Sequence, residues 1–244
     1  MVVTVLLVWL IRLPASEPTA LPAPTCDAPA RVRVFVLDSS DPPISPSQAT
    51  AIDELLKRFL DDGRVYDRVM VGRLTPSLTM PLEILWTGCD PGQESEVSSL
   101  RVSPKEARRR RESALVSKVR SAVDAAKVPS PTPLSPIAES WSMLFKDQRI
   151  LALRPTVEKT IIYVTDALEH LNPPLPSAYR SELATARARA YFEAFIGRAS
   201  NMNVTIGLLF RPDQKDKQMR DAKPWLHEFL RRSGVARIEW VDLW

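Results

Sequence analysis

Residues 34–48, VFVLDSSDPPISPSQ, join an apolar run to a polar turn and then to the start of a helix. This run is typical of a buried strand, which we predict at Arg31 to Leu37. Residues 45–48, SPSQ, favour a helix start, because serine caps a helix, proline suits its first position and glutamine can return a hydrogen bond. A strand, a turn and a helix in direct succession predict an alternating α/β chain.

The same alternation continues to the end of the chain. Further strands are predicted at residues 66–74, 81–86, 160–165, 203–210 and 236–243, and further helices at about 104–127, from 135 onward, around 184–195 and around 225–230. The link at 75–80 is short, which favours an antiparallel hairpin at a sheet edge. We therefore expect an α/β fold with a doubly wound, mostly parallel six-stranded sheet, one antiparallel edge strand and helices on both faces.

The chain has 244 residues, of which 45% are hydrophobic, and this is enough for one domain with a substantial core. We assign that domain to residues 31–244. Residues 1–12 are predicted to be a hydrophobic signal or anchor segment, and residues 13–30 a spacer rich in proline and alanine. These features favour a bacterial-type exported or membrane-tethered protein in the periplasm or outside the cell, with a cytoplasmic location as the alternative.

Charge and cysteine content exclude several classes of site. The 33 basic and 29 acidic side chains nearly balance, so no nucleic-acid partner is expected, and Arg108 to Arg111 are predicted to lie on a solvated helix face. The two cysteines, Cys26 and Cys89, are compatible with a disulfide or with two free thiols. No Cys-x-x-Cys pair or His/Cys cluster is present, which argues against structural zinc.

Two predicted strands end in carboxylates, Asp38 after the first and Asp166 after the central apolar strand. In a doubly wound sheet the carboxyl ends of parallel strands lie at one edge, which is the usual ligand site. Mg²⁺ prefers carboxylate, hydroxyl and water oxygens. Asp38, Ser40 and Asp166 therefore form a candidate metal site.

These residues resemble the von Willebrand factor type A (vWA) domains over residues 31–244. The adhesion site of that family joins an Asp-x-Ser-x-Ser loop, a threonine before a later helix and an aspartate after the fourth strand. The resemblance implies a metal site at Asp38, Ser40, Ser135 and Asp166 that holds Mg²⁺ or Mn²⁺. The site is degenerate, because Pro42 replaces the second serine and Ser135 the threonine. Asp41 is a candidate to hold a metal-bound water.

Structural roles are the alternative for each of these side chains. Ser40 and Asp41 suit the backbone hydrogen bonds of a turn, and Asp166 suits a turn or a cap. Ser135, followed by Pro136, suits a helix N-cap. His170 is expected to be a surface or loop residue, because the sequence provides no nucleophile motif beside it.

The vWA resemblance implies a binding module without catalytic activity, whose metal ion accepts a carboxylate from another protein. Contact with a membrane is expected only through the N-terminal segment. The alternative is a Mg²⁺-dependent phosphate-handling hydrolase or transferase that uses Asp38 and Asp166. The sequence has seven glycines and no glycine-rich phosphate loop, which favours the binding module.

Overall fold

The computed structural model describes residues 26–39, 43–96, 103–129, 135–151, 156–168, 199 and 201–244. The hydrophobic segment 1–12, most of the spacer, the turn residues Ser40 to Pro42, His170 and the helix expected around 184–195 lie outside the described residues. Within the described part, no helix has both the length and the apolar composition that crossing a membrane requires.

Six strands form one sheet in the order β3-β2-β1-β4-β5-β6. Their bounds are β1 Arg31–Leu37, β2 Arg68–Leu74, β3 Leu82–Cys89, β4 Glu158–Thr165, β5 Met202–Leu209 and β6 Arg237–Leu243. Every neighbouring pair is parallel except β2 and β3, which are antiparallel. The predicted fold class, the six strands and the antiparallel edge strand are confirmed.

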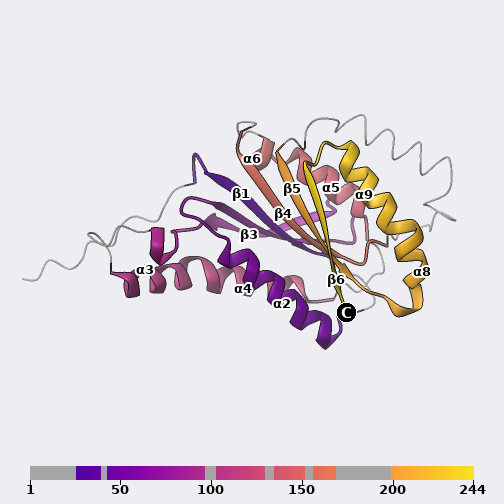
Figure 1. The fold of residues 1–244 in the computed structure, drawn as a ribbon, viewed down its shortest axis with the longest axis horizontal. Helices are drawn as coiled ribbons and strands as arrows, with labels where there is room; N and C mark the ends of the chain where they lie inside the picture. The colour runs from indigo at the N-terminus through magenta and orange to yellow at the C-terminus, as the bar shows by residue number, and fades with distance from the viewer. Residues whose placement is uncertain are drawn as a thin grey trace, which may run out of the picture.

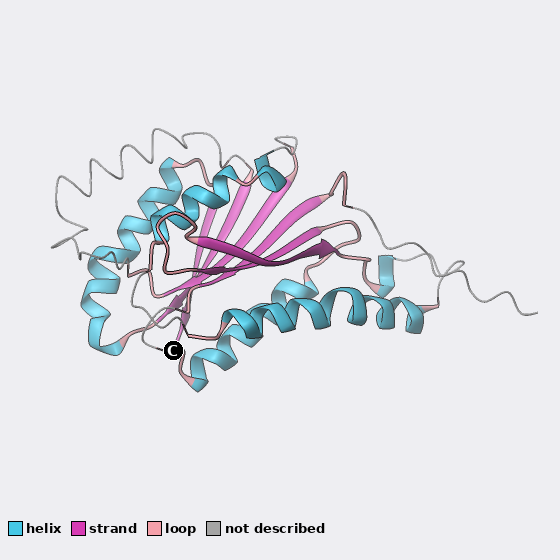
Figure 2. Ribbon diagram, turned by 180° about the vertical axis from the view of Figure 1, so that it is seen from behind, coloured by secondary structure: helices cyan, strands magenta, loops and turns pink. Residues whose placement is uncertain are grey.

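Helices cover both faces of this sheet, as Figure 1 shows. Below it in that view lie α2 (Pro46–Asp61), α3 (Pro104–Arg111) and α4 (Ser117–Ala126), with the π-helical segment Glu112–Val116 joining the last two. Above it lie α5 (Ile137–Lys146), α6 (Gln148–Leu151) and, after the short α8 (Lys215–Lys217) and a second π-helical segment (Gln218–Ala222), α9 (Lys223–Arg232). Figure 2 shows the same two layers from behind.

The alternation of side chains along β1 explains why both faces are covered. Val32, Val34 and Val36 belong to the core between the sheet and helices α5 and α9. Phe35 and Leu37 belong to the core on the other face, between the sheet and helices α2 and α4. A strand that is apolar on both faces has to be covered twice, which a doubly wound sheet does. The consequence is a buried central strand that delivers Asp38 to one edge.

The start of α2 also follows the prediction. Ser45 caps the helix by accepting a hydrogen bond from the amide of Gln48 at 3.2 Å, and the Gln48 side chain accepts one from the amide of Ser45 at 3.1 Å. Pro46 occupies the first helical turn. This capping box fixes where the helix begins and so the length of the turn after Asp38.

Candidate functional site

The carboxyl edge of the sheet, where the five parallel strands end, is the candidate site. Leu37 at the end of β1 pairs with Val164 in β4, Thr165 pairs with Leu208 in β5, and Leu209 pairs with Leu243 in β6. The residues that follow these strands therefore lie at the same level. We refer to this region as the carboxyl edge.

Asp38 is buried at the carboxyl edge, with only 2% of its surface exposed. Its Oδ2 accepts hydrogen bonds from the hydroxyl of Ser135 at 2.8 Å and from the hydroxyl of Thr165 at 2.9 Å. Its backbone amide donates to the carbonyl of Val164 at 2.8 Å. The carboxylate is thus held by the neighbouring strand and by the chain that leads into α5.

The proposed helix-capping role of Ser135 is wrong. Helix α5 begins at Ile137, Pro136 occupies the cap position, and no side chain caps this end of the helix. The fixed backbone of Pro136 shifts the start of the helix by one residue, so the Ser135 hydroxyl is free of the helix and instead donates to Asp38. The structure therefore places Ser135 beside Asp38, as the site prediction requires.

Asp166 is the second buried carboxylate, with 1% of its surface exposed. Its Oδ1 accepts a hydrogen bond from the amide of Leu168 at 2.9 Å, a local turn contact, and its Oδ2 lies 3.3 Å from the Nε of Arg211. Burial, followed by the negative charge of Asp38, raises the pKa of Asp166 to about 7, against the opposing effects of Leu168 and Arg211. The turn role expected for Asp166 is confirmed, and the two carboxylates lie close enough to interact.

Arg211 and Gln218 are site residues that the sequence did not indicate. The Gln218 side-chain amide donates to the carbonyls of Asp166 at 2.8 Å and Leu209 at 2.9 Å, and its oxygen accepts from the amide of Arg211 at 2.8 Å. Arg211 follows the predicted strand at 203–210, so its place after a parallel strand was the one available signal. Nothing in the sequence around Gln218 points to this role.

The predicted metal ligands are only partly described. Asp38, Ser135 and Asp166 lie at the carboxyl edge, whereas Ser40, Asp41 and Pro42 lie outside the described residues. Among the residues that the structure describes, no three His, Cys, Asp or Glu side chains are grouped as metal ligands. Both oxygens of Asp166 already accept hydrogen bonds, one of them from a guanidinium, so this described donor set does not fit a divalent cation.

The arrangement of strands and loops decides the type of fold. A doubly wound sheet with an antiparallel third strand carries Asp38 after β1, Ser135 before α5 and Asp166 after β4. This is the element order that the sequence resemblance implies. The chain has a vWA-like fold.

Solved structures that resemble this chain include two that are distant in sequence. No protein-family description and no curated protein matches the chain. The ArnB paralog VWA2 from Sulfolobus acidocaldarius is 10% identical, with a TM-score of 0.39 over 73% of this chain and 34% of that chain. The manganese-loaded TRAP protein from Plasmodium vivax is 12% identical, with a TM-score of 0.38 over 87% of this chain and 68% of that chain. The chain spans about a third of the length of the first of these proteins.

Several exposed apolar side chains lie along the carboxyl edge of this vWA-like sheet. Leu78 and Met80, which are 48% and 62% exposed, lie in the loop between β2 and β3, beyond the end of β2. Val128, 60% exposed, follows α4, and its carbonyl accepts a hydrogen bond from Ser39 at the end of β1. Trp244, 63% exposed, follows β6. Four of the seven exposed large hydrophobic side chains in the described residues thus belong to one edge.

A second charged cluster lies at the opposite, amino edge of the sheet. Arg31 pairs with the buried Asp67 at 2.7 Å, and Arg111 pairs with the buried Asp90 at 2.9 Å. The solvated-face prediction for the arginine run is therefore wrong for Arg111, which is 14% exposed. Arg111 turns inward because Asp90 needs a countercharge, whereas Arg108 remains 78% exposed.

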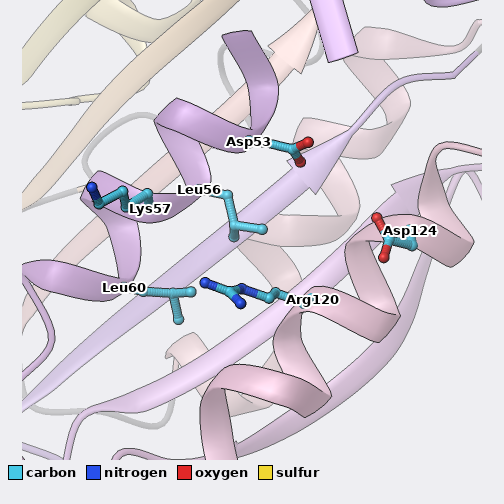
Figure 3. Close-up of a pocket in the computed structure, with 6 residues that line it drawn as sticks. All are labelled: Asp53, Leu56, Lys57, Leu60, Arg120 and Asp124. Atoms are coloured by element: carbon cyan, nitrogen blue, oxygen red, sulfur yellow. The ribbon is translucent and has the colours of Figure 1, made fainter. Parts of the chain in front are cut away.

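A pocket of about 340 Å³ lies between α2 and α4, away from Asp38 and Asp166. Leu56 and Leu60 line it together with four charged side chains, Asp53, Lys57, Arg120 and Asp124. Figure 3 shows Asp53 and Asp124 at one end of the pocket and Arg120 beside Leu60 at the other. Lys127 bridges the helices by pairing with Asp53 at 2.5 Å. The pocket is thus part of a helix contact that ion pairs hold together.

Proposed function

We propose that this chain is a protein-binding module of the vWA type, which contacts another protein through the carboxyl edge. The observation that carries the proposal is the exposure of Leu78, Met80, Val128 and Trp244, which are spread along that edge from the β2–β3 loop to the end of β6. Large exposed apolar side chains that share one edge of a domain favour an interaction surface there. The buried network around Asp38 and Asp166 gives these loops a rigid base.

The alternative phosphate-handling enzyme has weaker support. A nucleophilic carboxylate has to reach its substrate, but Asp38 and Asp166 are 2% and 1% exposed. Hydroxyls hold Asp38, and an amide and a guanidinium hold Asp166. These contacts suit a structural role better than covalent catalysis.

The expected location is part of the proposal. A disulfide joins Cys26 to Cys89, with 5.7 Å between the two Cα atoms, and disulfides persist in oxidising compartments. This bond supports an exported or tethered domain, held by residues 1–12, over a cytoplasmic one. Residues 26–30, at the end of the predicted spacer, would then connect the domain to its attachment.

The experiment is a crosslinking and capture assay with a double variant, Leu78→Asp/Met80→Asp. Two exposed charges in this loop should abolish capture of any partner that binds the carboxyl edge, without loss of thermal stability. Met143→Asp is the matched control, since Met143 is 36% exposed in the later half of α5. Equal capture by the wild type and the double variant would contradict the proposed surface. Phosphate-ester hydrolysis that disappears in Asp38→Asn would support the enzyme instead.

A further inference from the structure

Arg211 occupies an unusual position for a cationic side chain, because only 5% of its surface is exposed. Its Nε lies 3.3 Å from Oδ2 of Asp166, which is itself buried and within electrostatic reach of Asp38. A buried guanidinium is costly unless carboxylates compensate its charge. Asp166, which in turn interacts electrostatically with Asp38, provides that compensation at the carboxyl edge.

The backbone at Arg211 is fixed on both sides, so this placement does not depend on a flexible side chain alone. The amide of Arg211 donates to the Gln218 side chain at 2.8 Å. The carbonyl of the preceding residue, Phe210, accepts a hydrogen bond from the Gln48 side chain of α2 at 2.9 Å. Gln218 and Gln48 are 0% and 4% exposed. Two buried amide side chains, one from each layer of helices, therefore hold the backbone at Arg211 in place beside Asp166.

We infer that Arg211 supplies the positive charge that balances Asp166, and that this makes the carboxyl edge independent of divalent metal ions. The donor set argues for this directly. A metal ion bound at Asp166 would have to displace the guanidinium from Oδ2 or lie beside it, and both options are electrostatically unfavourable. The sequence resemblance implied a metal at this place, and the buried arginine disagrees with it.

The inference, which rests on the proposed function, also narrows the chemistry of the partner. The Arg211 side chain is 6% exposed, so a carboxylate on a partner cannot reach its charge without opening the site. A carboxylate bridged through a metal ion is disfavoured for the reason given above. The partner should therefore present apolar groups to Leu78, Met80 and Val128, and the contact should persist in EDTA.

The main experiment compares melting temperatures of the full chain in EDTA, Mg²⁺ and Mn²⁺. The wild type should melt at the same temperature in all three buffers. Arg211→Met should melt at a lower temperature in EDTA, because the buried Asp166 then lacks its paired cation. Its melting temperature should rise by roughly 5 °C or more when the metal concentration exceeds the Kd a hundredfold. Arg111→Met is the matched control, since it removes the cation from the buried Arg111–Asp90 pair. It should lose stability without gaining a response to metal.

Several outcomes would overturn the inference. Stabilisation of the wild type by either metal would do so, as would an Arg211→Met chain that folds but does not respond to metal. If Arg211→Met does not fold in any buffer, Arg211→Lys, which keeps the charge, and Arg211→Met/Asp166→Asn, which removes both charges, must fold. Failure of either variant would also overturn it.

The capture assay and the melting temperatures distinguish an error about the metal-independent contact from an error about the binding surface. Capture that is lost in Leu78→Asp/Met80→Asp and in EDTA would keep the binding surface but overturn the metal-independent contact. Capture that is unaffected by both changes would contradict the surface, while the melting temperatures would still decide the role of Arg211.

Discussion

Asp38 is a buried carboxylate whose Oδ2 accepts hydrogen bonds from the hydroxyls of Ser135 and Thr165. The hydroxyl oxygen of Thr165 also accepts a hydrogen bond from the amide of Ala167 at 3.0 Å. Ala167 has a φ of +60°, in the left-handed region that costs a residue with a Cβ some free energy. Thr165 therefore supports both the carboxylate and the strained turn that presents Asp166.

Ser135→Ala should lower the free energy of unfolding by about 1–2 kcal/mol, and Thr165→Val by about 2–3 kcal/mol, because each leaves Asp38 with one hydroxyl donor fewer. The larger loss belongs to Thr165, which makes two of the contacts. Urea unfolding measures both values. Ser121→Ala, at an exposed position of α4, is the control and should change stability by less than about 0.5 kcal/mol. Losses as small as that at Ser135 and Thr165 would contradict the network.

Asp166 should make stability depend on pH in an unusual direction. Burial and the charge of Asp38 raise its pKa from 3.8 to about 7, so the folded chain holds this proton more tightly than the unfolded chain does. The stability that the protonated group contributes is complete below about pH 4 and is lost as the pH rises to about 7. Between about pH 4 and pH 7, the free energy of unfolding of the wild type should fall by up to about 4 kcal/mol relative to that of Asp166→Asn.

Unfolding by urea at a series of pH values measures this difference. Asp147→Asn is the control of opposite sign. Burial raises the pKa of Asp147, but the hydrogen bonds from Arg149 and the charges of Arg149 and Arg68 together outweigh burial and lower this pKa. The wild type should therefore gain stability over Asp147→Asn as the pH rises through the acidic range. A difference between the wild type and Asp166→Asn that does not vary with pH would show that Asp166 is not held in this environment.

The two carboxylates could be predicted from sequence, but their cation could not. Asp38 and Asp166 directly follow apolar runs, and parallel strands bring such positions to one edge. The role of Arg211 depends on contacts with Asp166, which is 45 residues away, and with a glutamine in a π-helical segment. Local periodicity contains no information about such contacts. The same limit explains Arg111, whose inward direction is decided by Asp90 in a different element.

At the scale of elements, the end of α2 packs against the amino edge around Gly63. A Cβ at this position would lie 2.2 Å from Oδ2 of Asp90, 2.7 Å from Nη2 of Arg111 and 2.9 Å from Nη1 of Arg33. Those three side chains are buried or nearly so, and the ring of Phe59 in α2 lies 4.3 Å from the guanidinium carbon of Arg33. Gly63 is therefore required by the close approach of α2 to the ion pairs.

Gly63→Ala should lower the free energy of unfolding by about 2–4 kcal/mol, because the methyl group has to push apart a buried ion pair. Gly207→Ala is the control, since a Cβ there meets only the ends of apolar side chains, Leu243 at 3.0 Å and Leu55 and Val164 at 3.2 Å. Chemical denaturation should show the larger loss at Gly63. An equal or smaller loss at Gly63 would mean that the Asp90–Arg111 pair can shift at little cost.

At the scale of the whole molecule, the disulfide and the proposed binding surface lie at opposite edges of the sheet. Cys26 precedes β1 and Cys89 ends the antiparallel β3, so the disulfide lies at the amino edge. Asp38 and the exposed apolar side chains lie at the carboxyl edge, about 23 Å away along the seven residues of β1. The chain before Cys26 thus joins the domain at the edge opposite the proposed binding surface. A domain tethered at its N-terminus would present that surface away from its attachment.

The disulfide should also be a large contribution to stability, because it closes a loop with a sequence separation of 63 residues. Loop-closure entropy for that length corresponds to about 4 kcal/mol, and Cys26→Ser/Cys89→Ser should lose about 2–4 kcal/mol. Melting with and without a reductant measures this, with the double variant as the control that the reductant leaves unchanged. If the bond ties the N-terminal segment to the sheet without supporting the binding edge, the double variant should still capture a partner below its melting temperature. A wild type that melts identically in both conditions, with two free thiols by mass, would show that the domain folds without the bond, and the argument for an oxidising compartment would lose its support.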